Sequence, residues 1–406
     1  MTARRPEIAY LVPEFPSQTH SFFWREIHAI EDSGAPIALF STRRPSPDAC
    51  PHAFAREAAA RTTYLFPPAP GRMLGLLIRR PLRLLSAMGY VLSLTETPLA
   101  ARLRLLALIG SAADMASRCS EEGIAHVHIH SCANAAHLGA LAHILTGLSY
   151  SLTLHGDLRV YGTDHRAKMR NAGFVSAVTR PLQAALRREI GTTQHYPVIS
   201  MGVDTARFCP STDRSAAQET DRLEVVTVAR LNRTKGHHFF LRAMAKLRDE
   251  GIDIHYRIAG DGPERQRIEA EIAELGLAGQ VTLMGSVGED VVLQLLRSCD
   301  ALALNSIGEG EAAPVALMEA MSCGVPAVCS IIGGTADMIQ DGVDGFLVPQ
   351  EDVEAIAEAV RQFVADPDRR KRMGKAARTT ALEKFDHRRN AMALFGEIRE
   401  LALRVP

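Results

Sequence analysis

The sequence predicts an α/β protein with two doubly wound, Rossmann-like domains in tandem. The chain has 406 residues, short apolar runs alternate with longer amphipathic ones throughout, and a polar segment at 211–221 interrupts the alternation. This length exceeds one ordinary hydrophobic core, and alternating strands and helices are typical of parallel sheets. We therefore expect an N-terminal domain over 1–210, a linker over 211–221, a C-terminal domain over 222–385, and a helix at 386–406 that packs back on the first domain.

The predicted strands are short runs rich in Val, Ile, Leu and Ala, and the predicted helices repeat apolar residues every three or four positions. Ligands of such sheets bind outside the carboxyl ends of the strands, so the expected active site is a cleft between the two domains. The first domain is predicted to have strands at 8–12, 37–40, 126–130, 151–154, 174–177 and 196–199, with helices that include 22–32 and 180–189. The second is predicted to have strands at 224–229, 254–259, 281–284, 301–304, 327–329 and 346–348, with helices at 238–250, 263–275, 291–297, 314–322 and 353–365.

The composition is that of a globular protein in water, with 47% hydrophobic and 23% charged residues. Lys plus Arg balance Asp plus Glu at 46 each, so the net charge gives no reason to expect nucleic acid as a partner. The seven cysteines are dispersed without metal-binding spacing, which favours reduced thiols. We find no apolar run of transmembrane length and no signal-peptide pattern, and we expect a cytoplasmic protein.

Residues 71–110 have a different local composition, with six arginines, no lysine, one acid (Glu96) and many leucines. Basic, leucine-rich amphipathic segments are typical of helices that lie on anionic membranes. The alternative is a pair of ordinary surface helices whose leucines pack on a core. The first interpretation predicts a peripheral protein at the inner face of the plasma membrane.

The segment 309–324 carries most of the functional information, because Glu311 and Glu319 lie on either side of Pro314. Proline suits the start of a helix, so Glu311 should lie in the preceding loop and Glu319 inside the helix. The first N–H groups of a helix form an anion site, here near Ala313, Pro314 and Val315. A phosphate bound there would have one carboxylate on each side, although a solvated helix with two glutamates has the same pattern.

Two further loops of the second domain follow predicted strands. Arg230 and Lys235 follow the strand at 224–229, and two cations at that edge suit a diphosphate or are ordinary surface charges. Gly260 and Gly262 follow the next strand, where glycine permits a tight turn close to a ligand.

In the first domain, His155 ends a predicted strand, where an imidazole could hydrogen-bond a sugar hydroxyl or assist proton transfer. The segment after the first strand contains Phe15, Ser17 and Thr19 and could hold an acceptor or cap a helix. Three alternating histidines at 126, 128 and 130 favour packing on one strand face over metal binding.

In chain order, these residues resemble the retaining glycosyltransferases of the GT-B fold, and among them the large family 4. The similarity covers almost the whole chain. Two segments, Phe15-Pro16 and 314–321, are similar to enzymes of exopolysaccharide assembly such as the colanic-acid type. The motifs that carry it are His155-Gly156, Gly202-Val203-Asp204 with Phe208, Arg230 with Lys235-Gly236, Gly260-Asp261-Gly262, and Glu311 with Glu319-Ala320.

The resemblance implies a metal-independent hexosyltransferase without a cofactor, which uses a nucleotide-diphosphate sugar as donor and a glycan or polyprenyl-diphosphate-linked saccharide as acceptor. It implies that Arg230 and Lys235 neutralise the diphosphate and that Glu319 holds the ribose. It also implies that Glu311 and His155 contact the sugar at the reacting carbon.

The sequence departs from the family pattern at two places. Ala312 follows the first glutamate where the family usually has glycine, and the segment 15–20 replaces a Gly-Gly pair often found after the first strand. The alternative function is a non-catalytic nucleotide-sugar or glycan-binding protein on the same fold. A glycoside hydrolase that uses Glu311 and Glu319 as acid and base fits less well, because a diphosphate site has no part in that chemistry.

Overall fold

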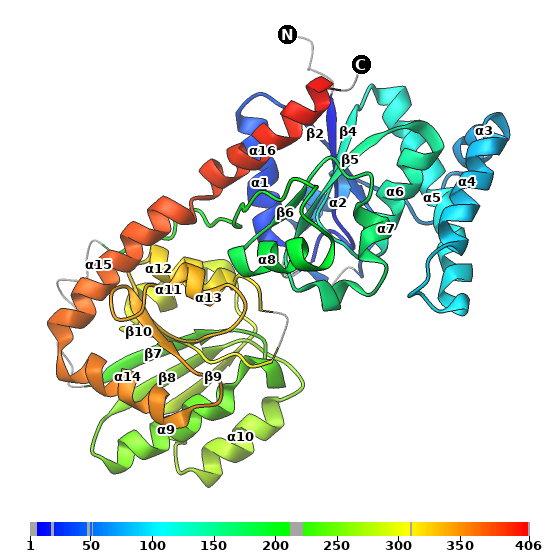
Figure 1. Cartoon of the computed structure of the whole chain (residues 1–406). Helices are drawn as coiled ribbons and strands as arrows, with labels where there is room; N and C mark the ends of the chain where they lie inside the picture. The colour runs from blue at the N-terminus through cyan, green and yellow to red at the C-terminus, as the bar shows by residue number, and fades with distance from the viewer. Residues whose placement is uncertain are drawn as a thin grey trace. The chain divides into compact units, whose positions relative to one another are not determined.

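The computed structural model describes residues 6–17, 20–46, 49–50, 52–211, 222–308 and 311–404. The chain forms two compact units (Figure 1). The first unit runs to Ser200 and includes the chain from Arg388 onward, and the second unit runs from Met201 to His387. Most of the predicted linker, residues 212–221, lies outside the described residues.

The first unit contains a six-stranded parallel sheet in the order β3-β2-β1-β4-β5-β6. The order reverses direction next to β1, as in doubly wound folds. The strands are β1 Ile8–Leu11, β2 Ile37–Ser41, β3 Thr62–Tyr64, β4 His126–Ile129, β5 Ser149–Leu154 and β6 Val175–Ala177.

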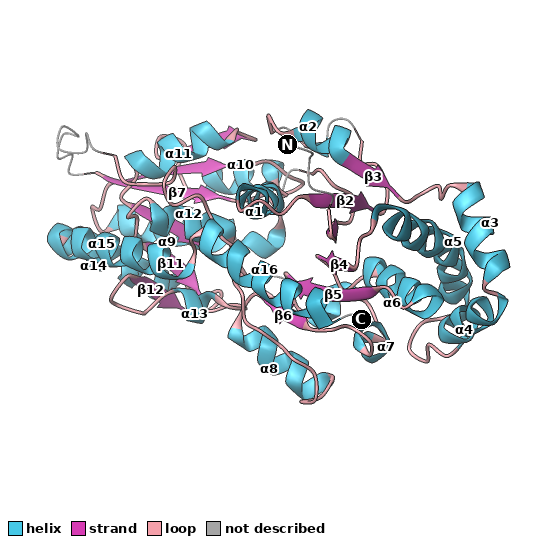
Figure 2. Cartoon of the chain, turned by 90° about the horizontal axis from the view of Figure 1, so that it is seen from above, coloured by secondary structure: helices cyan, strands magenta, loops and turns pink. Residues whose placement is uncertain are grey.

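Helices cover both faces of this sheet (Figure 2). One face carries α1 and the C-terminal helix α16, whose Ala391, Leu394 and Ile398 join the same buried cluster as Trp24 and Ile27. The helices and 3-10 turn are α1 Ser21–Asp32, α2 Ala55–Arg61, α3 Pro70–Arg79, α4 Pro81–Leu92, α5 Leu99–Glu122, α6 Asn134–Thr146, η2 Leu158–Tyr161, α7 His165–Met169, α8 Arg180–Glu189 and α16 His387–Arg404.

The second unit has a six-stranded parallel sheet of the same kind, in the order β12-β11-β10-β7-β8-β9. The carboxyl ends of β7, β8, β10 and β11 therefore lie near one another at one edge. The strands are β7 Leu223–Val228, β8 Ile254–Ala259, β9 Val281–Gly285, β10 Ala301–Leu304, β11 Ala327–Ser330 and β12 Gly345–Val348.

Helices α9 and α14 pack side by side on this sheet through a buried cluster that includes Phe240, Leu247, Val360 and Phe363. The helices and 3-10 turn of the unit are η4 Arg233–Lys235, α9 His237–Asp249, α10 Arg265–Glu274, α11 Glu289–Ser298, α12 Val315–Ser322, α13 Thr335–Met338, α14 Val353–Ala365 and α15 Pro367–Lys384.

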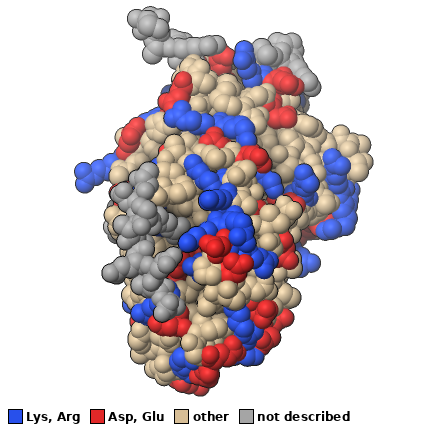
Figure 3. All heavy atoms as spheres, turned by 90° about the vertical axis from the view of Figure 1, so that its left-hand side faces the viewer, with Lys and Arg blue, Asp and Glu red and all other residues tan. Residues whose placement is uncertain are grey.

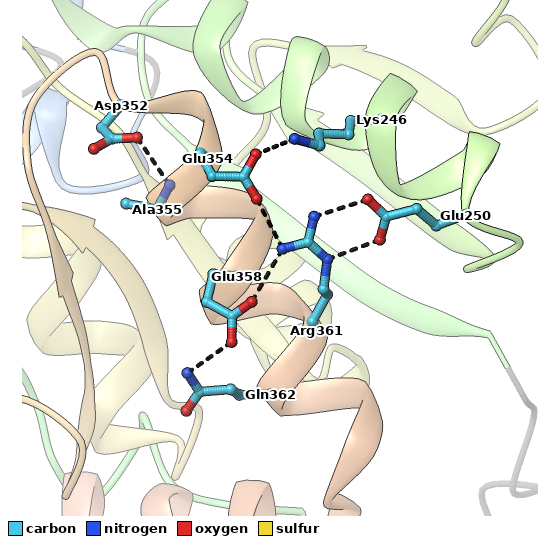
Figure 4. Close-up of polar contacts among 8 residues, drawn as sticks. All are labelled: Lys246, Glu250, Asp352, Glu354, Ala355, Glu358, Arg361 and Gln362. Atoms are coloured by element: carbon cyan, nitrogen blue, oxygen red, sulfur yellow. Dashed lines mark hydrogen bonds and ion pairs between the residues drawn. The ribbon is translucent and has the colours of Figure 1, made fainter.

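A surface ion network also joins α9 and α14 (Figure 4). Arg361 contacts Glu250 at 2.7 Å, Glu354 at 2.9 Å and Glu358 at 3.0 Å, and Lys246 pairs with Glu354. These carboxylates raise the pKa of Arg361 further above its ordinary value. Cationic and acidic side chains are interspersed over the face drawn in Figure 3, in line with the zero net charge.

The prediction of two doubly wound sheets is confirmed, with three local differences. The predicted strand 196–199 forms only one bridge, between Val198 and Ala177, and the sixth strand is the short β3 instead. Pro314 is the N-cap of α12 and lies just before its first helical position, with ψ 119°. Helix α15 was not predicted, because its sequence is strongly charged and has a weak apolar stripe.

Candidate functional site

The loops after β7 and β8 are held together by two glycines. A Cβ at Gly260 would lie 1.9 Å from the carbonyl oxygen of Ala229, and a Cβ at Gly262 would lie 2.4 Å from that of Leu231. The Leu231 N–H donates to the Asp261 carbonyl at 3.0 Å. No larger residue fits at either glycine without moving the backbone, so the two loops pack directly backbone against backbone.

The loop after β10 packs against the loop after β7. Gly236 has φ +64°, and a Cβ there would lie 1.8 Å from the carbonyl oxygen of Asn305. The Ile307 N–H donates to the Thr234 carbonyl at 2.8 Å. Gly236 therefore meets two requirements at once, a left-handed backbone and a close approach to the neighbouring loop.

The loop after β11 closes the group. A Cβ at Gly333 would lie 1.8 Å from the carbonyl oxygen of Glu311, and the Gly334 N–H donates to the Ala312 carbonyl at 2.7 Å. Positive φ among the described non-glycine residues is confined to Glu14, Asp164 and Glu351. Ala312 thus occupies the position of the usual family glycine with an ordinary φ.

Lys235 and Glu311 form an ion pair at the centre of these loops. The Ser306 hydroxyl donates to the same Glu311 carboxylate oxygen at 3.1 Å. Lys235 ends the 3-10 turn η4, and the tight Gly236 backbone fixes where its side chain starts. The paired side chains are half-buried or buried, so solvent screens them less than an exposed pair.

Arg230 and His237 precede and follow Lys235 in the chain. The Arg230 side chain is exposed and has no hydrogen bond or ion pair with any residue in the described ranges, so its charge is free to meet a ligand. The His237 Nε2 lies 3.2 Å from the Arg230 carbonyl oxygen, and burial lowers the pKa of His237 to about 4. His237 is therefore neutral near neutral pH, and Arg230 and Lys235 supply the positive charge here.

Helix α12 begins at the same edge. Its cap Pro314 and the preceding Ala313 follow the Glu311 loop, and Val315 is the first helical residue. Glu319 lies in the second turn, and only 8% of its surface is exposed. Glu311 and Glu319 thus take the loop and helix positions expected from the sequence. Glu309 and Gly310, which precede them, lie outside the described residues.

Two buried polar side chains at this edge are unsatisfied. Asn305 is 4% exposed, and neither its amide oxygen nor its amide nitrogen has a hydrogen-bond partner among the described residues. The Ser330 hydroxyl is likewise buried without a described partner. Leu304 pairs with Cys329, so Asn305 and Ser330 follow in register at the ends of β10 and β11. Unpaired buried polar groups are rare and point to a missing ligand or water.

The first unit has a histidine pair at the carboxyl edge of its sheet. His155 follows β5 directly, and its Nε2 lies 3.2 Å from Nδ1 of His130, which follows β4. The other His130 nitrogen lies 3.3 Å from a Glu26 carboxylate oxygen on α1. The Tyr161 hydroxyl accepts from the His155 backbone N–H at 2.8 Å. His130 thus contacts the His155 ring, and Tyr161 binds the His155 backbone.

The His155 imidazole is neutral at ordinary pH. Burial lowers its pKa well below the ordinary value, and the nearby His130 and His20 imidazoles act in the same direction. Phe22 and Phe23 contact the ring at centroid distances of 5.2 Å and 5.1 Å. The His155 Nδ1 has no hydrogen-bond partner among the described residues, which leaves a polar atom for a ligand hydroxyl.

The predicted acceptor-side residues are placed differently from one another. Phe15 is buried and stacks with His20 at 5.9 Å. The Ser17 carbonyl accepts from the His20 N–H at 3.0 Å. Helix α1 has no side-chain cap, so the expected capping role of this segment is wrong for the described residues. Thr19 lies outside them.

The remaining alternating histidines are structural. His126 bonds the hydroxyls of Ser149 and Ser151, and His128 bonds those of Ser151 and Thr153, which ties β4 to β5. Burial lowers the pKa of His126 to about 3. Within the part of the chain that the structure describes, no three His, Cys, Asp or Glu side chains are grouped so as to hold a metal.

Sequence reasoning missed several residues of these two clusters. Ser306 and Asn305 follow the predicted strand at 301–304, so their position at a strand end was a usable signal. The contact of Glu26 with His130 had no such signal, because Glu26 lies inside helix α1.

The fold with its two parallel sheets is of the GT-B class. The structure of HepE from Anabaena, described as a complex with UDP, superposes with a TM-score of 0.75 at 18% identity, covering 97% of this chain and 100% of that one. Sucrose-phosphate synthase from Thermosynechococcus elongatus superposes with a TM-score of 0.74 at 20% identity, covering 97% and 99%. At such identities these similarities concern the fold.

The sequence itself is similar to known glycosyltransferases. Residues 211–380 match the model of the family "Glycosyl transferases group 1". Escherichia coli K12 WcaL, whose name assigns it to colanic acid biosynthesis as a glycosyltransferase, is 30% identical over 269 residues, or 65% of this chain and 64% of WcaL. Most of the second unit is therefore similar to the glycosyl transferases group 1 family, in agreement with the resemblance. The chain spans less than two thirds of the length of WcaL.

Proposed function

We propose that this chain is a retaining glycosyltransferase that moves a hexose from a nucleotide-diphosphate sugar to a glycan or lipid-linked saccharide in polysaccharide biosynthesis. The observation that carries the proposal is the Lys235–Glu311–Ser306 cluster at the converging loops of the second sheet. A cation and a carboxylate held together at a strand edge and helix end suit a ligand with a phosphate and a hydroxyl-bearing group.

The donor is bound by charge and by backbone geometry. Lys235 and the free Arg230 neutralise the diphosphate, with the start of α12 at Ala313, Pro314 and Val315 beside it. The rigid glycines at 260 and 262 let the backbone approach the ligand closely. The buried Glu319 carboxylate accepts hydrogen bonds from the ribose hydroxyls.

Transfer then needs little more than positioning and electrostatics. Glu311 and the neutral His155 hold hydroxyls of the donor sugar near its anomeric carbon. The bond from that carbon to the phosphate oxygen breaks, the acceptor oxygen bonds to the same face, and the acceptor proton moves to the departing phosphate. Lys235 and Arg230 stabilise the charge that develops on this leaving group without reorganising. This set of cations needs no metal.

The acceptor side is proposed from chemistry and similarity together. WcaL is named for colanic acid biosynthesis. A glycan or polyprenyl-diphosphate-linked saccharide is therefore the proposed acceptor, and Phe15, Ser17 and Thr19 are the proposed contacts. We place the protein in the cytoplasm, peripheral to the inner face of the plasma membrane. None of the described helices combines the length and apolarity needed to cross a bilayer.

The experiment is an activity screen with nucleotide-diphosphate sugars and membrane-extracted acceptors, for the wild type and for Lys235→Ala, Glu319→Ala and His155→Ala. We expect transfer with retained anomeric configuration in the wild type, and loss of transfer in each variant with unchanged circular dichroism. Normal turnover by the variants would contradict the site. Donor binding without hydrolysis or transfer across the panel would instead favour a non-catalytic nucleotide-sugar or glycan-binding protein.

A further inference from the structure

Helices α3 and α4 both present large apolar side chains to solvent. No residue of α3 is buried. Ile78 is 74% exposed, Leu82 77% and Leu85 63%, and Leu74 and Leu92 are half exposed or more. The spacing is four positions on α3 and three and seven positions on α4, so each set lies on one side of its own helix. We refer to Leu74, Ile78, Leu82, Leu85 and Leu92 as the apolar row.

The opposite side of the two helices is firmly attached to the first unit. The Met73 sulfur packs where a Cβ of Gly110 on α5 would lie, and the Tyr90 hydroxyl lies 2.8 Å from His137 Nδ1 on α6. Ala87 and Val91 are buried. The two helices therefore pack on α5 and α6 through one face (Figure 1, Figure 2). The apolar row consists of side chains that this packing leaves exposed.

The charges on and beside these helices are mainly cationic, and Glu121 of α5 pairs with Arg72 of α3 at 2.8 Å. Arg79, Arg83 and Arg104 are exposed and form no hydrogen bond or ion pair with residues in the described ranges. The only acid between 71 and 110 is Glu96. A Glu96 carboxylate oxygen accepts from the Asp164 backbone N–H at 2.8 Å, so this acid is tied to another loop.

We propose that this surface docks on an anionic lipid bilayer, with the apolar row in the acyl boundary and Arg79, Arg83 and Arg104 at the lipid phosphates. Exposed leucines in a contiguous patch mark an interaction site, and a cationic rim selects anionic lipid. A second copy of the chain fits less well, because a two-fold contact brings like arginines together. The surface deepens the proposed acceptor side of the function.

The test is vesicle flotation of the full-length chain with phosphatidylcholine alone and with added phosphatidylglycerol. We expect binding only to the anionic vesicles, and a loss of at least about tenfold in affinity for Ile78→Ser/Leu82→Ser and for Arg79→Glu/Arg83→Glu. Matched controls are Leu382→Ser, at a leucine that is 45% exposed on α15, and Arg372→Glu on the same helix, which should bind like the wild type.

A second readout reports on depth. Trp24 is the only tryptophan and is buried, so a Leu82→Trp variant adds one exposed fluorophore. Its emission should shift to the blue on anionic vesicles and be quenched by brominated lipid. Equal binding by all variants, or no spectral shift, would overturn the proposal. Self-association without vesicles that Ile78→Ser/Leu82→Ser abolishes would overturn it in favour of a second copy. Lipid binding needs no donor or acceptor, so it can fail or hold independently of the proposed enzyme activity.

Discussion

The Lys235 ammonium and the Glu311 carboxylate form an ion pair although 76 positions separate them in the chain. The contact joins the loop after β7 to the loop after β10, and Ser306 donates to the same carboxylate. Glu311 neutralises the charge that the proposal assigns to a diphosphate. When the donor binds, Lys235 must therefore interact with both the Glu311 carboxylate and the diphosphate.

Replacing Glu311 by Gln should change diphosphate binding and sugar transfer in opposite directions. A nucleoside diphosphate without sugar should bind about threefold to tenfold more tightly, because a nearby negative charge is removed and Lys235 is released. Sugar transfer should fall, because the proposed sugar contact is weakened. Calorimetric titration and an activity assay measure the two effects. Weaker binding of the bare diphosphate would contradict this account of the pair.

Glu319 should discriminate ribose from its dideoxy analogue. The wild type should bind the ribonucleoside diphosphate about tenfold to hundredfold more tightly than the dideoxy form, the range expected for hydrogen bonds to a charged group. Glu319→Ala should bind both forms equally and at the weaker level. The comparison is internal to one protein, so a general loss of stability cannot imitate it. Retained discrimination in the variant would exclude Glu319 from the ribose site.

Asn305→Leu should stabilise the protein and weaken the donor site. Leucine has a similar volume and removes two unsatisfied polar atoms, so the free energy of unfolding should rise by about 1 kcal/mol or more. Affinity for the donor should fall by about tenfold if the amide binds ligand. Urea unfolding and titration measure both quantities. Ser330→Ala is the companion variant, and a destabilised Asn305→Leu protein would show that a buried water already satisfies the amide.

Acid should unfold the first unit before the second. Burial holds the pKa of His20 and His137 at about 4 and that of His126 at about 3, and lowers that of His155, whereas His237 alone shows such a shift among described residues of the second unit. Unfolding restores the ordinary value of 6.5. Below that pH the unfolded chain binds protons that the native chain does not. The free energy of unfolding therefore decreases by roughly 1.4 kcal/mol per histidine for each unit by which the pH is lowered.

The measurement uses the single tryptophan. Trp24 lies in the buried cluster of the first unit, so its emission reports that unit, and far-ultraviolet circular dichroism reports the whole chain. On acidification from neutral pH, the red shift of the Trp24 emission should occur before half of the helical circular dichroism signal is lost. His126→Gln should move the Trp24 transition to lower pH if the variant folds. If the Trp24 emission and the circular dichroism signal of the wild type change at the same pH, the prediction that the first unit unfolds first is contradicted.

The sequence was enough to predict the architecture, because period and length mark strands and helices reliably when the alternation is regular. It failed at 62–64 and at 196–199. The first is a three-residue edge strand with little pattern to detect, and the second is apolar but makes only one bridge. The residues of these two segments do not determine whether a strand forms, because strand formation there depends on the neighbouring strand.

The site was predictable in part for the same reason. Lys235, Glu311 and His155 could be named because each follows a strand, and parallel strands end at one edge. Their partners depend on tertiary contacts that no spacing encodes. Glu26 contacts His130 from helix α1, and Asn305 becomes informative only once its burial is known.

The central claim is that the second unit binds a nucleoside diphosphate through Lys235. The direct measurement is calorimetric titration of UDP, GDP and ADP into the wild type, Lys235→Ala and Arg233→Ala, the last an exposed cation on the same 3-10 turn. We predict that at least one diphosphate binds the wild type and Arg233→Ala alike and binds Lys235→Ala about tenfold to hundredfold more weakly. Equal affinity for Lys235→Ala and the wild type, or no binding of any diphosphate, would contradict the claim.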